Sequence, residues 1–394
     1  MKKVFGLIIV LFSVIALVSC KKEKVIKFAV QADSTPALEA IVAEFNKGDH
    51  GYKVEIVKMP NDSNQMRDNI ITSLSSGSDD YDLVSMDVVW AGQFAAAGYL
   101  EPLDELIDDA DWKISDFNNG SMASGKYSGK HFSLPYFPDL GFLYYRKDLV
   151  DATDSAKLAS GNYTWNDLLT MAEKYATSSI NGIVFQAIQN EGLICNFNEF
   201  SDNFADIENG LKLMKAFTDA TFTPNDILTY DEAATHTAFL QGKAVFARNW
   251  PYMNGMVSSD ESEITPEQVG YAPLPLGGTV GGWLVGINKN TDVMEGAKEF
   301  IQFFTGPKGQ KINALKGSYI PGYNELLEDE EVLEANAILN SDAFQKALQT
   351  TIARPVSPNY AELSYDLQLA IHKYLAGDAT LQATLTAIEE ALDE

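Results

Sequence analysis

The segments that decide the fold are VIKFAVQ (residues 25–31), YKVEIVKM (residues 52–59) and LVSM (residues 83–86). Each is short and rich in β-branched or aromatic residues, which predicts a strand. Residues 35–46, 66–74 and 89–97 follow these strands and carry apolar side chains at helical spacing. Alternation of strands with helices predicts an α/β domain with a largely parallel sheet.

Helices and strands continue along the rest of the chain. Thr164 and Asp167 form a capping-box pattern that predicts a helix to about Ala176. Asp292 suggests the N-cap of another helix, which Gly306-Pro307 ends. Further helices are expected at 207–217, 231–241 and the C-terminus, and strands at 182–188 and 243–247. A chain of 394 residues without a long linker predicts two domains joined by short crossings.

The N-terminus has the pattern of a cleaved export signal. Two lysines precede an apolar run over residues 4–18, and Leu17-Val18-Ser19-Cys20 is followed at once by charged residues. We therefore expect a signal peptide at 1–19, a lipid on Cys20 and a tether over 20–24; an uncleaved anchor is the alternative. The chain would then be exported and lipid-anchored to the cell membrane, facing the periplasm or exterior. Cys195 has no disulfide partner once Cys20 is acylated.

Charge and motifs exclude several classes of protein. A formal net charge of -26 argues against nucleic-acid binding. The four histidines are far apart in the sequence and match no zinc motif, and no G-x-S-x-G elbow occurs. Glycines at 277–282 lack the lysine and hydroxyl residue of a P-loop. We expect no catalytic activity, no cofactor and no metal.

Aromatic rings, carboxylates and one arginine occur where strands end and loops begin. Such positions hold ligands in α/β folds. Rings offer flat apolar faces, carboxylates accept hydrogen bonds and arginine donates several, a combination that suits a sugar. The residues concerned are Asp87, Phe137, Asp139, Trp250, Tyr252, Gly282, Trp283 and Arg354.

Structural alternatives compete with this interpretation at several positions. Trp112 and Trp165 are expected to pack at helix starts, and Trp90 is balanced between core and site. Asp87 by itself is best explained as a helix N-cap. Asp139 stands in an apolar, proline-framed segment where an unpaired charge is costly to bury, which favours a functional role.

Several segments in this order and spacing resemble a known family. They are YDLVSMD (81–87), GYLEPL (98–103), the stretch from Leu134 to Leu149, TWNDL (164–168), FLQGKA (239–244), GYAPLP (270–275) and GGW (281–283). Over essentially the whole mature chain the sequence resembles extracellular solute-binding proteins of family 1, of the maltose/trehalose-binding type. These are the capture components of ABC importers.

The resemblance implies a periplasmic-binding-protein-like fold of type II. In this fold two α/β lobes enclose a ligand cleft and short crossing segments act as hinges. The crossings would lie near Phe137–Gly141 and Tyr271–Pro275. The N-terminal lobe would comprise 25–136 and 276–325, and the C-terminal lobe 142–270 and 330–394.

The resemblance also implies ligand contacts and partners. Asp33 and Ser34 fall loosely where the family places a polar sugar contact. Asp87, Phe137, Asp139, Trp250, Tyr252, Gly282, Trp283 and Arg354 match further ligand positions, whereas Glu191 lies in a divergent region and is not included. We expect a monomer that binds a carbohydrate of oligosaccharide size and docks on permease subunits. There are two alternatives. The same fold could bind a solute that is not a sugar, or the protein could be a glycoside hydrolase that uses Asp87 and Asp139.

Overall fold

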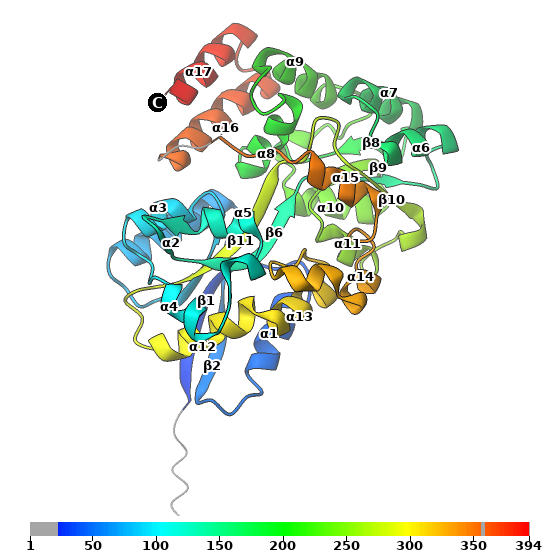
Figure 1. The fold of residues 1–394 in the computed structure, drawn as a ribbon. Helices are drawn as coiled ribbons and strands as arrows, with labels where there is room; N and C mark the ends of the chain where they lie inside the picture. Colours follow the sequence, from blue (N-terminus) through cyan, green and yellow to red (C-terminus); the bar gives the residue numbers. More distant parts are fainter. Residues whose placement is uncertain (1–22, 356–358, 394) are drawn as a thin grey trace, which may run out of the picture.

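The computed structural model describes residues 23–355 and 359–393 as two α/β lobes (Figure 1). The predicted signal peptide (1–19) and the lipidated Cys20 lie outside the described residues. Within the described ranges, no helix combines the length and apolar character needed to cross a bilayer.

The first lobe is built on a five-stranded sheet in the order β2-β1-β3-β11-β6. β1, β2 and β3 are parallel, and β11 runs antiparallel to its neighbours β3 and β6. The strands are β1 (Lys24–Gln31), β2 (Tyr52–Met59), β3 (Leu83–Asp87), β6 (Leu134–Leu140) and β11 (Val280–Ile287).

Helices cover both faces of this sheet because its strands are apolar on both sides. On one face Ile26 and Phe28 pack against α1 (Ala37–Phe45) and α12 (Met294–Thr305). On the other face Ala29 and Val84 pack against α2 (Ser63–Ser75) and α3 (Ala91–Ala96). Because β1 and β3 are parallel neighbours, their carboxyl ends lie at the same edge of the sheet, which faces the second lobe (Figure 1).

The second lobe has a four-stranded sheet in the order β10-β7-β9-β8. Its strands are β7 (Phe142–Arg146), β8 (Asn181–Val184), β9 (Ala244–Asn249) and β10 (Val269–Ala272). Its helices are α6 (Ala152–Ser160), α7 (Trp165–Tyr175), α8 (Glu191–Phe200), α9 (Ile207–Thr218), α10 (Glu232–Leu240), α11 (Met253–Val257), α15 (Asp342–Gln349), α16 (Tyr360–Ala376) and α17 (Leu381–Asp393).

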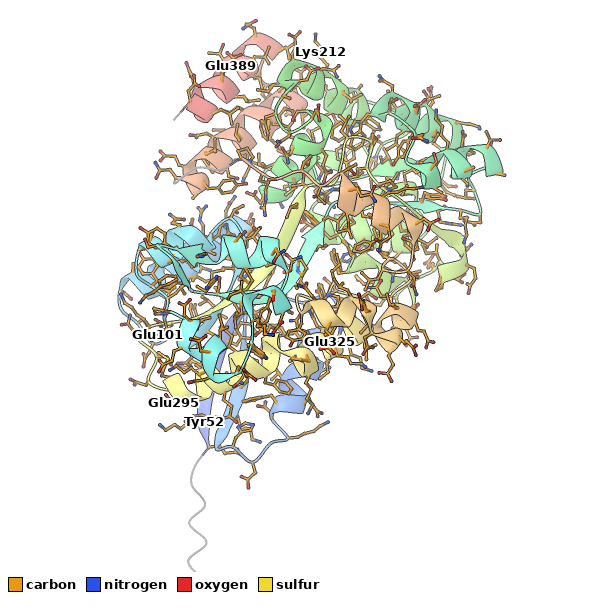
Figure 2. The ribbon with its side chains drawn as sticks, in the orientation of Figure 1. Tyr52, Glu101, Lys212, Glu295, Glu325 and Glu389 are labelled. Carbon is orange, nitrogen blue, oxygen red and sulfur yellow. The ribbon has the colours of Figure 1, made fainter. Side chains whose placement is uncertain are left out.

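Short elements complete the two lobes. They are α4 (Asp104–Asp109), α5 (Asn119–Ser124), the hairpin β4 (Lys126–Tyr127) and β5 (Lys130–His131), α13 (Pro307–Gly317), α14 (Glu330–Ala335) and the 3-10 turns at Ile114–Asp116, Ile227–Thr229, Pro266–Gln268 and Asn324–Glu328. Charged side chains such as Lys212, Glu295, Glu325 and Glu389 lie on the outer surface (Figure 2).

Three chain segments lie side by side where the lobes join. Gly141, between β6 and β7, donates its N–H to the Thr279 carbonyl at 3.0 Å. The Ile352 N–H donates to the Gly278 carbonyl at 3.0 Å, and the Ile352 carbonyl accepts from the Val280 N–H at 2.8 Å. The lobe boundaries suggested by the sequence stay predictions.

The predicted elements agree with the structure except at some ends. The segment expected to be a strand to residue 188 leaves the sheet after Val184, because Ala187 and Ile188 donate their N–H groups to the Tyr230 carbonyl instead. Asp292 was expected to cap α12 and does not. The Thr291 hydroxyl accepts from the Val293 N–H at 3.1 Å, and α12 begins at Met294 without a side-chain cap.

Candidate ligand-binding site

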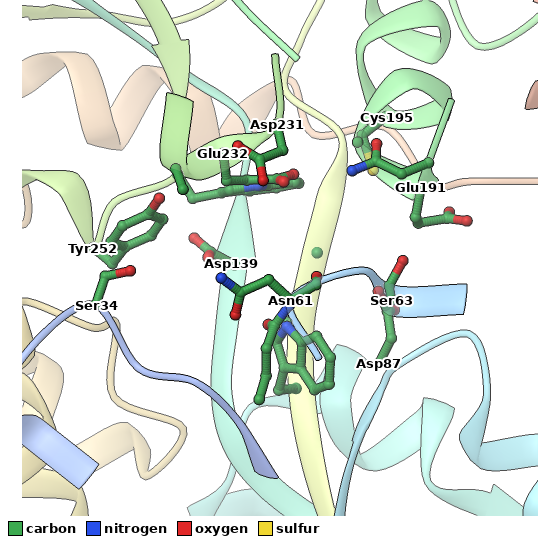
Figure 3. A pocket seen from close by; sticks show the side chains of 18 of the residues that line it. Ser34, Asn61, Ser63, Asp87, Asp139, Glu191, Cys195, Asp231, Glu232 and Tyr252 are labelled. Atoms are coloured by element: carbon green, nitrogen blue, oxygen red, sulfur yellow. The ribbon is translucent and has the colours of Figure 1, made fainter. Parts of the chain in front are cut away.

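A pocket between the two lobes is lined by residues from both, and we call it the cleft (Figure 3). Its space, including the part open to solvent, is about 960 Å³. It is lined by Gln31, Ala32, Ser34, Asn61, Ser63, Asp87, Phe137, Asp139, Asn190, Glu191, Gly192, Cys195, Asp231, Glu232, Ala233, Trp250, Tyr252, Gly281, Gly282, Trp283, Tyr319 and Arg354.

All predicted ligand-binding residues except Asp33 lie in this lining. The Asp33 carboxylate holds the start of α1: it accepts from the N–H groups of Thr35 at 2.8 Å and Leu38 at 3.0 Å. It also accepts from the Tyr319 hydroxyl at 2.7 Å. Asp33 therefore orients Tyr319, which lines the cleft, whereas Asp33 itself lies behind the lining.

Two tryptophans line the cleft from opposite lobes. Trp250 follows β9 directly, and the Arg248 guanidinium lies 4.2 Å from the centre of its ring. Trp283 lies in β11 directly opposite Asp87 of β3. Trp90 packs edge-on against Trp283 with ring centres 5.5 Å apart and is 3% exposed, so it belongs to the core behind the cleft.

A stack of three rings lines another side of the cleft. Phe137 and Tyr319 are stacked with centres 4.3 Å apart, and Tyr319 lies 6.4 Å from Tyr252 of the second lobe. The Tyr252 hydroxyl is hydrogen-bonded to His236 Nδ1 at 2.9 Å. Each ring is thus fixed by its neighbours, and the three together give this side of the cleft an apolar surface.

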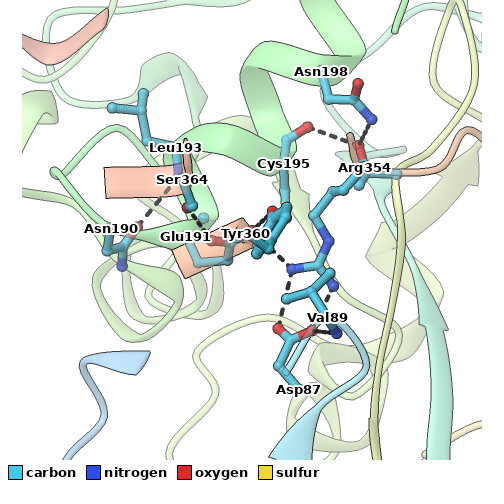
Figure 4. Close-up of polar contacts among 12 residues, drawn as sticks. Asp87, Val89, Asn190, Glu191, Leu193, Cys195, Asn198, Arg354, Tyr360 and Ser364 are labelled. Atoms are coloured by element: carbon cyan, nitrogen blue, oxygen red, sulfur yellow. Dashed lines mark hydrogen bonds and ion pairs between the residues drawn. The ribbon is translucent and has the colours of Figure 1, made fainter. Parts of the chain in front are cut away.

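Arg354 joins the two lobes at one end of the cleft (Figure 4). It donates to both carboxylate oxygens of Asp87, at 2.6 and 3.1 Å, and to Glu191 at 2.8 Å. Glu191 also accepts from the hydroxyls of Tyr360 and of Ser364, the latter at 2.6 Å. We call these five residues the Arg354 cluster. Among the described residues, Arg354 Nε is a buried nitrogen with no hydrogen-bond partner.

Two carboxyl groups in the lining have altered acidity. Burial raises the pKa of Asp139 well above its usual range, and a nearby Arg248 and the Leu140 N–H only partly oppose this. Burial also raises the pKa of Glu232. A buried carboxyl that can hold a proton can donate as well as accept hydrogen bonds, which suits hydroxyl groups.

Sequence reasoning missed several residues of the lining. Asn190 and Asp231 are N-caps: their side chains accept from the N–H groups of Leu193 and Ala234. Cap residues at the starts of α8 and α10 were a usable signal, because both helices begin beside the cleft. Tyr319 carried no such signal, since it follows α13 in a loop far from any predicted site segment.

Among residues 23–355 and 359–393 no group of three or more histidine, cysteine, aspartate or glutamate side chains is arranged to hold a metal ion. Cys195 lines the cleft, and burial raises the pKa of its thiol. A thiol with a raised pKa is a weak nucleophile at neutral pH. The arrangement is suited to binding: aromatic rings and hydrogen-bonding side chains face a common space.

Comparison with known proteins identifies relatives over most of the chain. A "Probable ABC transporter-binding protein" of Deinococcus radiodurans is 28% identical over 87% of this chain and 86% of its own length. A "Maltotriose-binding protein" of Pyrococcus abyssi is 25% identical, covering 77% of this chain and 68% of its own.

Solved structures share the same fold. Maltose-bound MalE3 of T. maritima superposes with a TM-score of 0.84 at 30% identity, covering 94% of this chain and 99% of its own. A solute-binding protein of Agrobacterium radiobacter K84 in complex with ribitol has a TM-score of 0.80 at 23% identity, which concerns the fold alone. The predicted type II fold is therefore confirmed. Residues 31–311 match the model for bacterial extracellular solute-binding proteins, and the chain belongs to that family.

Proposed function

We propose that this protein captures a carbohydrate in the cleft and delivers it to the permease of an ABC importer. The observation that carries the proposal is the pair of tryptophans, Trp250 and Trp283, facing a space that is also lined by carboxylates from both lobes. A sugar presents flat C–H faces to rings and a rim of hydroxyls to acceptors. Relatives that bind maltose and maltotriose support a carbohydrate.

Ligand binding in the cleft would favour closure of the lobes. Asp87, Phe137 and Trp283 belong to the first lobe, whereas Glu232, Trp250 and Tyr252 belong to the second. A ligand that touches both sets gains contacts only when the lobes are close, so it shifts the population toward the closed form. A permease can then recognise the closed form, and no chemical step by the protein is required.

The test is calorimetric titration and thermal shift with a panel of mono- and oligosaccharides. Trp250→Ala and Trp283→Ala should weaken binding by roughly ten- to hundredfold, since losing burial of a large ring costs about 1.5–3 kcal/mol. Trp112→Phe is the matched control, because Trp112 packs on Phe117 away from the cleft. Absence of binding across the panel would reject a carbohydrate ligand. Release of reducing sugar instead of stoichiometric binding would favour the hydrolase alternative.

We also propose that Cys20 carries a lipid that keeps the protein at the membrane near its permease. The described chain begins at Glu23, and β1 begins at Lys24, so a tether from Cys20 to the first lobe is only a few residues long. Cys20→Ser should release the protein from the membrane fraction without changing ligand affinity, because the cleft lies outside the tether. A protein that stays in the membrane fraction, or one that no longer binds ligand, contradicts the proposal.

A further inference from the structure

We infer that the buried Glu199–Arg248 pair is a positioning element that sets the orientation of Trp250 and ties it to the lobe crossings. The inference rests on the proposed function in that Trp250 is taken as a ligand platform. Neither Glu199 nor Arg248 lines the cleft, and the pair lies directly behind it.

The pair is fully enclosed and closely bonded. Glu199 is 0% exposed and Arg248 is 1% exposed. Arg248 Nε donates to Glu199 Oε2 at 2.9 Å and Nη2 donates to Oε1 at 2.5 Å, so the two planar groups meet edge to edge. Arg248 Nη1 donates to Gln186 Oε1 at 3.1 Å. Three bonds from three different nitrogens leave the guanidinium plane with one orientation.

The guanidinium supports the ring of Trp250. Its central carbon lies 4.2 Å from the ring centre, a distance typical of a cation–π contact. The far edge of the indole reaches Gly281: a Cβ there would lie 2.9 Å from Cζ3 of Trp250. The Trp250 carbonyl accepts from the Tyr144 hydroxyl at 2.9 Å, which fixes the backbone but not the ring. Arg248 therefore supports one face of the ring, and the Trp250 side chain also reaches the Glu232 carboxyl.

Glu199 connects this support to the lobe crossings. Its Oε1 accepts from the Thr279 N–H at 2.9 Å, just before β11. Gly141, in another crossing, lies so close that a Cβ there would be 2.0 Å from Glu199 Oε1 and 2.5 Å from Arg248 Nη2. One carboxylate thus contacts the strand that leaves the first lobe, the strand that returns to it, and the arginine beneath Trp250.

Stability alone does not account for an ion pair at this place. Removing two charges from water is expensive, and well-packed neutral residues often give equal or greater stability. What neutral residues lack is the shape of the guanidinium. It has a fork that fits a carboxylate and a flat face that fits an indole.

The first test needs no ligand. Fluorine-19 NMR of protein labelled with 5-fluorotryptophan reports each tryptophan, and Trp250→Phe assigns the resonance of Trp250. Arg248→Met should shift and broaden that resonance and leave that of Trp112 in place, since the Trp112 ring packs on Phe117 and Tyr323 in the first lobe. Arg248→Lys should also displace it, because lysine keeps the charge without the plane. An unchanged Trp250 resonance in both variants would overturn the inference.

The paired variant Glu199→Gln with Arg248→Met guards against simple misfolding. Glutamine at position 199 retains an oxygen that can accept from the Thr279 N–H. Both substituted side chains are neutral, so no unpaired charge is left buried. We expect its melting temperature to stay near that of the wild type while the Trp250 resonance is still displaced. A Trp250 resonance that returns to its wild-type position in this variant would show that the pair only stabilises the fold.

Affinity for maltose and maltotriose supplies the second test. Arg248→Met should weaken binding at least tenfold in the wild-type background and by less than twofold when Trp250→Ala is already present. Equal losses in both backgrounds would contradict a role exerted through Trp250. If the wild type binds neither these sugars nor any in the panel, the carbohydrate proposal fails, whereas the NMR result still decides whether the pair positions Trp250.

Discussion

At the scale of single residues, polar side chains beside the cleft are held by protein partners in low-dielectric surroundings. His236 is 6% exposed, and its Nδ1 is bonded to the hydroxyl of Tyr252. Burial lowers its pKa from 6.5 to about 4, and Asp231 opposes this only in part. The imidazole is therefore neutral in the folded protein throughout the physiological range.

This lowered pKa predicts a loss of stability in mild acid. Between pH 6.5 and about 4 the unfolded chain takes up a proton at His236 that the folded chain does not, so the free energy of unfolding falls as pH falls. The pKa difference corresponds to about 3 kcal/mol at the low end of this window. Above pH 6.5 both states are neutral and no effect is expected.

His236→Gln should remove this contribution. Denaturant unfolding of the wild type and the variant from pH 8 to pH 4 would show parallel behaviour above pH 6.5 and a shallower decline for the variant below it. His372→Gln is the control on a histidine that is less buried. Identical slopes for His236→Gln and the wild type between pH 6.5 and 4 would contradict a neutral buried imidazole.

At the scale of elements, the crossings depend on close backbone approach. Gly141 separates β6 from β7 and leaves no room for a side chain beside the Glu199–Arg248 pair. Gly278 is equally confined, because a Cβ there would lie 2.1 Å from the Gly141 carbonyl oxygen. Glycine is required at both positions by space, since neither has a left-handed backbone.

Gly141→Ala is therefore expected to be strongly destabilising. The added methyl must displace a buried ion pair, so we expect a loss of about 3 kcal/mol or more in the free energy of unfolding. Gly92→Ala is the matched control: Gly92 lies in α3 with open space around it, and alanine should gain about 0.5–1 kcal/mol there. Thermal unfolding compares the two. Similar melting temperatures for both variants would show that the crossing tolerates a side chain.

At the scale of the whole molecule, direct hydrogen bonds join the two lobes. Arg354 connects Asp87 of the first lobe to Glu191 of the second, and Asn64 of α2 donates to Gln368 of α16 at 3.0 Å. If the arginine were absent, no cation would lie between the carboxylates of Asp87 and Glu191.

Arg354→Met should shift the ligand-free protein toward an open form. Removing one partner of a buried ionic network costs about 3–5 kcal/mol, and separation of the lobes lets water reach both carboxylates. Small-angle X-ray scattering should give a larger radius of gyration for the variant than for the wild type. Arg146→Met is the control, because the Arg146–Asp148 pair lies within the second lobe. An unchanged radius for Arg354→Met would mean that the cluster does not hold the lobes together.

Local sequence patterns were sufficient for the elements and for the aromatic and acidic residues at strand ends. Strands such as VIKFAVQ and the capping box of Thr164 depend on neighbours within one or two turns, so their signals are contained in the chain itself. Trp250 and Trp283 were predicted because one follows a strand within Trp-Pro-Tyr and the other follows Gly-Gly, and both settings are poorly suited to a core.

The sequence by itself determined the α/β class, the strand-end location of the candidate site and nine of the residues in its lining. Only the tertiary structure decided that Asp33 lies behind the lining, that Arg354 links Glu191 to Asp87 of the other lobe, and that Glu199 and Arg248 support Trp250. The reason is physical: these contacts join residues far apart in the chain, and buried polar groups take whichever partners the packed lobes bring within hydrogen-bond distance.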